Sequence, residues 1–171
     1  RELVHCLTFE SNDTSKTGCV QDLHHLCRAC PSLHRYAVAE LEQTADEACS
    51  GEEVQYCGGV WNALSALGND PHLPDAAEAQ AALARFVRNA SLPHAPVEAN
   101  AALVTLLAPS RALLSAVAER LHQRSPYEVG LLGPAADGAP HDQHLDLLLA
   151  GAVLARRGHA HPRAAARIAD L

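Results

Sequence analysis

The sequence has no methionine, few aromatic residues and no long apolar run. Its longest apolar stretch, residues 145–155, is interrupted by Asp146 and is too short to cross a bilayer. No apolar segment follows a basic start, so no signal peptide is recognisable. Because the chain opens on Arg1, we expect either a processed mature chain or a piece of a longer one.

Lysine is nearly absent as well. Lys16 is the single lysine, and 13 basic residues face 20 acidic ones, which gives a net charge of −7. A general nucleic-acid binder needs a basic surface, so we expect no nucleic-acid partner. Apolar residues make up 48% of 171 residues, enough for one globular core. Alanine and leucine are abundant and β-branched residues scarce, which favours helices over sheets.

Cysteine is absent from the last two-thirds of the chain. The first third holds an even number, which is typical of a disulfide framework in an oxidising compartment. We expect disulfides with a pairing that the sequence leaves open, at Cys6, Cys19, Cys27, Cys30, Cys49 and Cys57. Glycosylation sequons at Asn12 and Asn89 point the same way. The expected location is therefore secreted or lumenal in the secretory pathway, as a glycoprotein.

Cys27 and Cys30 form a C-x-x-C pair, which has two other interpretations. Thioredoxin-like redox chemistry needs a βαβ context, and this chain shows none. A four-cysteine zinc site needs a second such pair, which is also missing. We expect each of these cysteines to form a disulfide elsewhere.

Apolar residues recur at helical spacing along most of the chain, with proline and glycine between the segments. Asp75 and Glu78 have the spacing of a capping box. A long loop is expected over residues 125–140, which hold several prolines and glycines. Helices are expected over 20–29, 32–49, 52–67, from about 75 to 88, 96–108, 110–123, 141–157 and from 162 to the end.

Short helices in pairs, with a repeat of about forty residues, are typical of HEAT-type arrays. The expected fold class is all-α, a right-handed α-solenoid of short helix pairs whose first third is stapled by disulfides. A compact helical bundle is the alternative. We expect residues 1–57 to form a disulfide-rich helical cap on a helical-repeat region at 58–171, in one continuous domain that is either a processed mature chain or a piece of a longer one.

Three passages resemble a known family. They are LPDAAEAQAALARF at 73–86, EANAAL at 98–103 running into PSRALL at 109–114, and LLLAGAVLA at 147–155. In this order they resemble the helical domain of the large lipid transfer proteins, the vitellogenin, apolipoprotein B and microsomal triglyceride transfer protein group, over roughly residues 60–171. The resemblance implies a frame that braces a lipid cavity formed elsewhere in the parent chain. It implies no functional residues here, and the cysteine-rich first third departs from it.

Two constellations of polar residues are candidate sites. His141 and His144 are spaced so that both could face one metal ion, but no third and fourth ligands follow at suitable spacing. Solvated residues at a helix start are the alternative, and we expect no metal and no cofactor. Near the C-terminus, Arg156, Arg157, Arg163 and Arg167 could face an anionic partner or lipid head groups, with a solvated surface as the alternative.

The sequence contains no nucleophile elbow, Walker loop, dinucleotide fingerprint or HExxH motif. We therefore expect a protein that is not an enzyme. The expected function is a non-catalytic scaffold segment of a secreted lipid-carrying protein, bracing its lipid-binding cavity. The alternative is a secreted, disulfide-stapled helical module that binds a protein partner or receptor. A cytokine-type bundle fits less well, since such bundles use four long helices.

Overall fold

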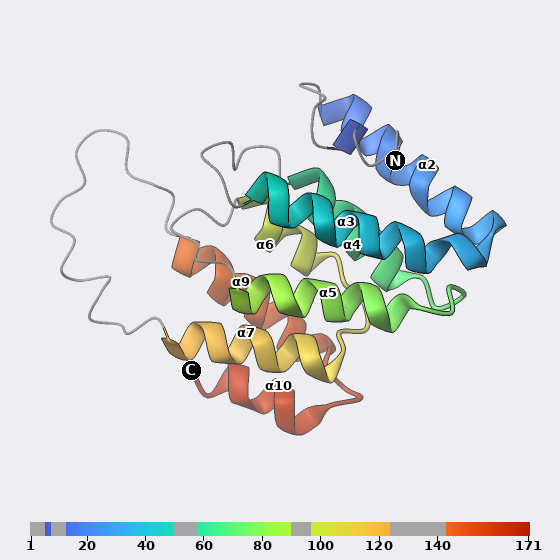
Figure 1. Cartoon of the computed structure of the whole chain (residues 1–171). Coiled ribbons are helices and arrows are strands. Elements are labelled where there is room, and N and C mark those ends of the chain that lie inside the picture. Colours follow the sequence, from blue (N-terminus) through green and yellow to red (C-terminus); the bar gives the residue numbers. More distant parts are fainter. Residues whose placement is uncertain (1–5, 8–12, 50–57, 90–96, 124–142) are drawn as a thin grey trace, which may run out of the picture.

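The computed structural model describes residues 6–7, 13–49, 58–89, 97–123 and 143–171 (Figure 1). Within these ranges the chain is helical and contains no strand, which confirms the all-α class. The elements are α2 (Asp13–Ala29), the 3-10 helix η1 (Pro31–Leu33), α3 (His34–Cys49), α4 (Gly58–Asn69), α5 (Ala76–Asn89), α6 (Val97–Val104), α7 (Arg111–Gln123), α9 (Gln143–Arg157) and α10 (Pro162–Ala169).

The helices pack in two rows, and successive helices alternate between them. Helices α3, α5, α7 and α10 lie side by side in that order in the front row of Figure 1. Helices α2, α4, α6 and α9 follow one another in the second row. Contacts between α4 and α5 and between α9 and α10 join the rows.

Local chemistry explains where several helices differ from the expected bounds. Helix α2 begins at Asp13, earlier than the expected start at residue 20. Its first residues are Asp, Thr and Ser, which favour helix starts. Helix α6 ends at Val104 rather than near residue 108. There the Leu106 N–H bonds back only three residues, to the Leu103 carbonyl at 3.2 Å, which tightens the chain ahead of Pro109. The expected loop at 125–140 lies outside the described residues.

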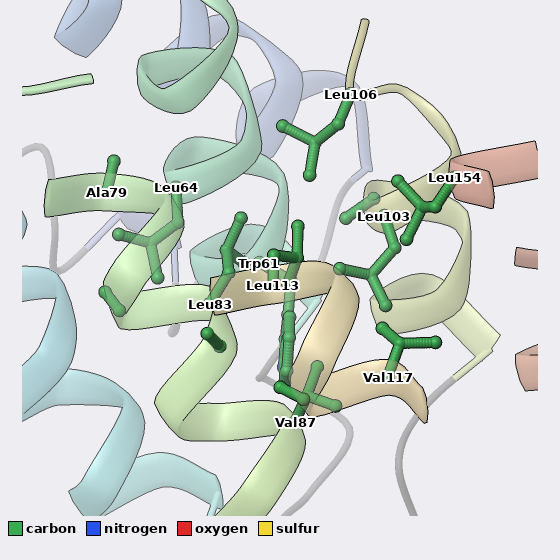
Figure 2. Packing of buried hydrophobic residues seen from close by; sticks show 14 of the residues in the cluster. Trp61, Leu64, Ala79, Leu83, Val87, Leu103, Leu106, Leu113, Val117 and Leu154 are labelled. Carbon is green, nitrogen blue, oxygen red and sulfur yellow. The ribbon is translucent and has the colours of Figure 1, made fainter. Parts of the chain in front are cut away.

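One hydrophobic core runs through both rows, from Leu7 to Ile168. Figure 2 shows the part where α4, α5, α6 and α7 meet, with Trp61, Leu83 and Leu103 among its side chains. The Trp61 ring meets the Phe86 ring edge-on, with centroids 5.5 Å apart, a geometry that aromatic pairs favour. Helix α4 is almost wholly buried and lies at the centre of this core.

The buried faces of α3 and α9 can be compared with their apolar patterns. Helical spacing predicts Tyr36 on the buried face of α3, but this prediction is wrong: Tyr36 is 75% exposed, while His34 and Val38 are buried in its place. Helix α9 is apolar nearly all round, a pattern typical of a helix that is covered on more than one side. Helices α6, α7 and α10 pack on it, in agreement with this pattern, although Leu149 remains 58% exposed.

Two glycines in helices provide a matched test of the packing. A methyl group on Gly59 would overlap the backbone carbonyl of Leu7, whereas one on Gly18 would meet nothing within 4 Å. We expect Gly59→Ala to lower the free energy of unfolding by about 1–3 kcal/mol through overpacking. Gly18→Ala, in contrast, should raise it by up to about 1 kcal/mol, because alanine favours helix. Urea denaturation of both variants checks this; equal effects would mean that the contact between Leu7 and α4 is absent.

Candidate functional site

A cluster of charged side chains lies where α2 meets the turn after α4. The Asp70 carboxylate is nearly buried and faces the Nε2 of His24 at 2.9 Å and the Nε of Arg28 at 3.4 Å, both from α2. It also accepts the backbone N–H of His72 at 2.9 Å. Burial acts to raise the pKa of Asp70, but the His72 N–H, His24 and Arg28 outweigh it and hold that pKa below its ordinary value.

His34 lies close to this cluster, at the start of α3, and its side chain is fully buried. Neither ring nitrogen has a hydrogen-bond partner among the residues that the structure describes. The nearest carboxylate is that of Asp75, 3.9 Å from Nδ1. Burial lowers the pKa of His34, although Asp75, Glu78 and Asp70 oppose the shift, so the buried ring is kept neutral.

Asp75 does not act as the expected capping box. The Glu78 N–H bonds to the Asp75 backbone carbonyl at 2.8 Å rather than to its side chain. The carboxylate instead lies toward His34. The competing interaction comes from α3, far away in sequence.

The histidine–aspartate pair has no activated nucleophile next to it in the described part of the chain. Cys27, one helical turn from His24, is buried, and burial together with Cys30 raises the pKa of its thiol. A thiol with a raised pKa is a poor nucleophile. The Cys30 Sγ lies 3.3 Å from the Ser32 hydroxyl. The arrangement joins α2 to α4 and does not form a nucleophile–base pair.

The cysteines follow the expected disulfide framework only in part. Cys6 and Cys19 form a disulfide, with Cα atoms 6.4 Å apart. Cys27 and Cys30 are free thiols, so the expectation that each is in a disulfide was wrong. Cys27 points into the hydrophobic core, where a thiol packs as a small apolar group. The side chain of Cys49, at the end of α3, and the whole of Cys57 lie outside the described residues.

The expected glycosylation and metal residues fall mostly outside the description. Asn12 and His141 are not described, and neither is the side chain of Asn89 at the end of α5 or of His144 in α9. Among the described side chains, no group of three or more histidines, cysteines or carboxylates is placed to hold a metal ion.

The four C-terminal arginines do not form one cluster. Arg157 is structural: it donates to the backbone carbonyl of Val104 and, at 2.9 Å, to that of Leu106. Arg163 and Arg167 line a pocket between α7 and α10 together with Arg111. Arg156 is exposed on α9 and lies outside that pocket. The sequence gives no sign of Arg111 as a member of this group, because α7 and α10 come together only in the folded chain.

Sequence analysis also missed a set of amides that hold the rows together. The Gln80 amide nitrogen donates to the carbonyls of Gly68 and Ala108, both at 2.9 Å, and its oxygen accepts the Ser110 N–H at 2.6 Å. Asn69 likewise bridges the Thr105 carbonyl and the Leu107 N–H. These two side chains fix the connection between α6 and α7 onto α4 and α5.

No family model, curated protein or solved structure matches the chain. In the described ranges, no helix is both long enough and apolar enough to cross a membrane.

Proposed function

We propose that this chain is a non-catalytic helical frame within a secreted lipid-carrying protein, built as an α-solenoid that braces a lipid-binding cavity. The observation that supports this most is the alternation of helices between two rows from α2 to α10. In such an array each pair packs on the next and curvature creates an extended inner surface. A frame of this kind acts through shape and burial of apolar surface rather than through a reacting group.

Two structural observations and one sequence resemblance support the proposal further. The disulfide between Cys6 and Cys19 fits a protein of the secretory pathway. The buried amide of Gln80 makes three hydrogen bonds to the backbone, a device that favours one rigid arrangement of the rows. The resemblance of residues 60–171 to the large lipid transfer proteins points to the same role.

The test is organic extraction and lipid mass spectrometry of the protein isolated from its natural source. We expect phospholipid or neutral lipid in stoichiometric amount or above. A secreted protein of known lipid-free composition, purified in the same way, serves as the control for carry-over. A lipid content equal to that of the control would overturn the lipid-carrying role.

A partner-binding module is the second candidate, and one observation favours it. Leu26, Leu33 and Tyr36 are exposed around the connection from α2 through η1 to α3. Exposed apolar residues normally occur singly on a protein surface, so three of them around one connection favour a contact surface there. Saturable binding of the labelled chain to intact cells tests this. Binding that Tyr36→Ser abolishes and Leu149→Ser leaves intact would favour a receptor contact at this corner; absence of binding would exclude it for those cells.

A further inference from the structure

A pocket of about 380 Å³ opens between α7 and α10. Arg111 and Ser115 contribute from α7, and Arg163 and Arg167 contribute from α10. Each pair is four residues apart, so both members lie on one face of their helix. The packing of α7 against α10 turns these faces toward the same opening, which His161 and Pro162 complete.

Among the described residues, the arginines of this pocket have no carboxylate partner, although the protein is acidic overall. No acidic side chain lines the pocket, and Arg111, Arg163 and Arg167 make no ion pair within the described residues. Other arginines do find carboxylates: Arg28 pairs with Asp70, Arg85 with Glu42 and Arg88 with Glu119. Three guanidinium groups are thus gathered with no counter-charge from the described part of the chain, which concentrates positive potential in a concave site.

The backbone adds to the same potential. Helix α10 begins at Pro162 beside the pocket, with no acidic residue in its first turn and no side-chain cap from His161. The start of a helix carries a partial positive charge and favours an anion. The N-terminus of α10 and the three arginines therefore both contribute positive potential to the same pocket.

We propose that this pocket binds a phosphate monoester. Guanidinium groups match the oxygens of a phosphate in paired hydrogen bonds, and the Ser115 hydroxyl adds a further donor. A volume of about 380 Å³ is at the lower end of small-molecule sites, so it holds one phosphorylated head rather than a polymer. The net charge of −7 also disfavours a long polyanion. Such a pocket would serve equally in a lipid carrier or in a partner-binding module.

Isothermal titration of the whole chain tests this with glycerol 3-phosphate, and with vesicles of phosphatidic acid in phosphatidylcholine as a second probe. We expect saturable binding of the free phosphate, the vesicles or both. Binding of the free ester identifies a soluble ligand, and binding of the vesicles alone identifies a lipid head group. Salt at about 1 M should weaken either interaction, because screening is then effective within about 3 Å.

Matched arginine variants locate the site. We expect Arg167→Gln and Arg111→Gln each to weaken binding about tenfold or more, because each removes a charged hydrogen-bond donor. Arg156→Gln removes the same charge from the surface of α9 and should leave binding unchanged. An unchanged melting temperature in each variant excludes unfolding as the cause. Failure of both probes to bind, or equal weakening by Arg156→Gln, would overturn the assignment.

Discussion

Gln80→Leu is expected to destabilise the protein by about 3 kcal/mol or more. Leucine fits the available volume but strands the carbonyls of Gly68 and Ala108 and the N–H of Ser110. Gln80 is only 6% exposed and its bond to Gly68 is buried, so water cannot readily replace the partner of that carbonyl, while the bonds to Ala108 and Ser110 are part-buried. Each buried backbone group left without a partner costs about 1–3 kcal/mol. Urea denaturation monitored by circular dichroism gives the free energy of unfolding.

Gln21→Leu is the matched control, because Gln21 is exposed on α2. A surface substitution of this kind changes stability by no more than about 0.5 kcal/mol. Equal unfolding midpoints for the two variants would contradict the bracing role of Gln80. Hydrogen exchange should in addition show faster exchange for the connection between α6 and α7 in Gln80→Leu, since that connection loses its anchor.

The second large effect is expected at His34, in the opposite direction. His34→Leu should raise the free energy of unfolding by about 1–3 kcal/mol, because it removes two buried nitrogens that have no hydrogen-bond partner in the described part of the chain. His25→Leu is the control, since His25 is an exposed histidine on α2. A loss of stability in His34→Leu would mean that the imidazole has a favourable partner in solution.

The same residue predicts how stability changes with pH. Burial lowers the folded-state pKa of His34 below its ordinary value of 6.5, so the unfolded chain binds this proton first as pH falls. The contribution of neutral His34 is therefore complete above 6.5 and decreases as pH falls toward the folded-state pKa. Asp70, whose pKa is also lowered, contributes fully above its ordinary value of 3.8 and stays constant in this range.

Melting temperatures measured between about pH 7 and pH 5 separate the two contributions. We expect wild type to lose more stability over this range than His34→Leu, because only wild type carries a buried base that must be protonated. Parallel curves for the two proteins would contradict the assignment of this pH dependence to His34.

Periodic segments bounded by strong stops were predicted well from the sequence. Helices α5 and α7 follow their apolar spacing closely. This spacing puts Leu83, Leu113 and Val117 on the apolar faces of these helices, and all three are buried. Helix α10 begins at Pro162, as predicted from a proline that follows the helix-ending Gly158. In these segments the helix propensity, the apolar spacing and the proline and glycine stops all predict the same helix, and tertiary packing is consistent with it.

The errors occur where partners distant in sequence decide the outcome. The sequence of α3 alone does not indicate whether Tyr36 or His34 is buried. The packing of α3 beside α2, α4 and α5 determines that the histidine is the buried one. Gln80 looks like an ordinary surface residue until the α6–α7 connection lies over it. Arg111 joins Arg163 and Arg167 because α7 and α10 pack together, and no local signal in the sequence reports this contact.

The central claim is that a rigid helical frame supports lipid carriage. The most direct measurement compares the lipid content per secreted protein for wild type, Gln80→Leu and Gln21→Leu, by organic extraction and mass spectrometry. We expect wild type and Gln21→Leu to carry equal lipid and Gln80→Leu to carry less, because loosening the rows weakens the frame. Equal lipid in all three proteins, or no lipid in wild type, would contradict the account.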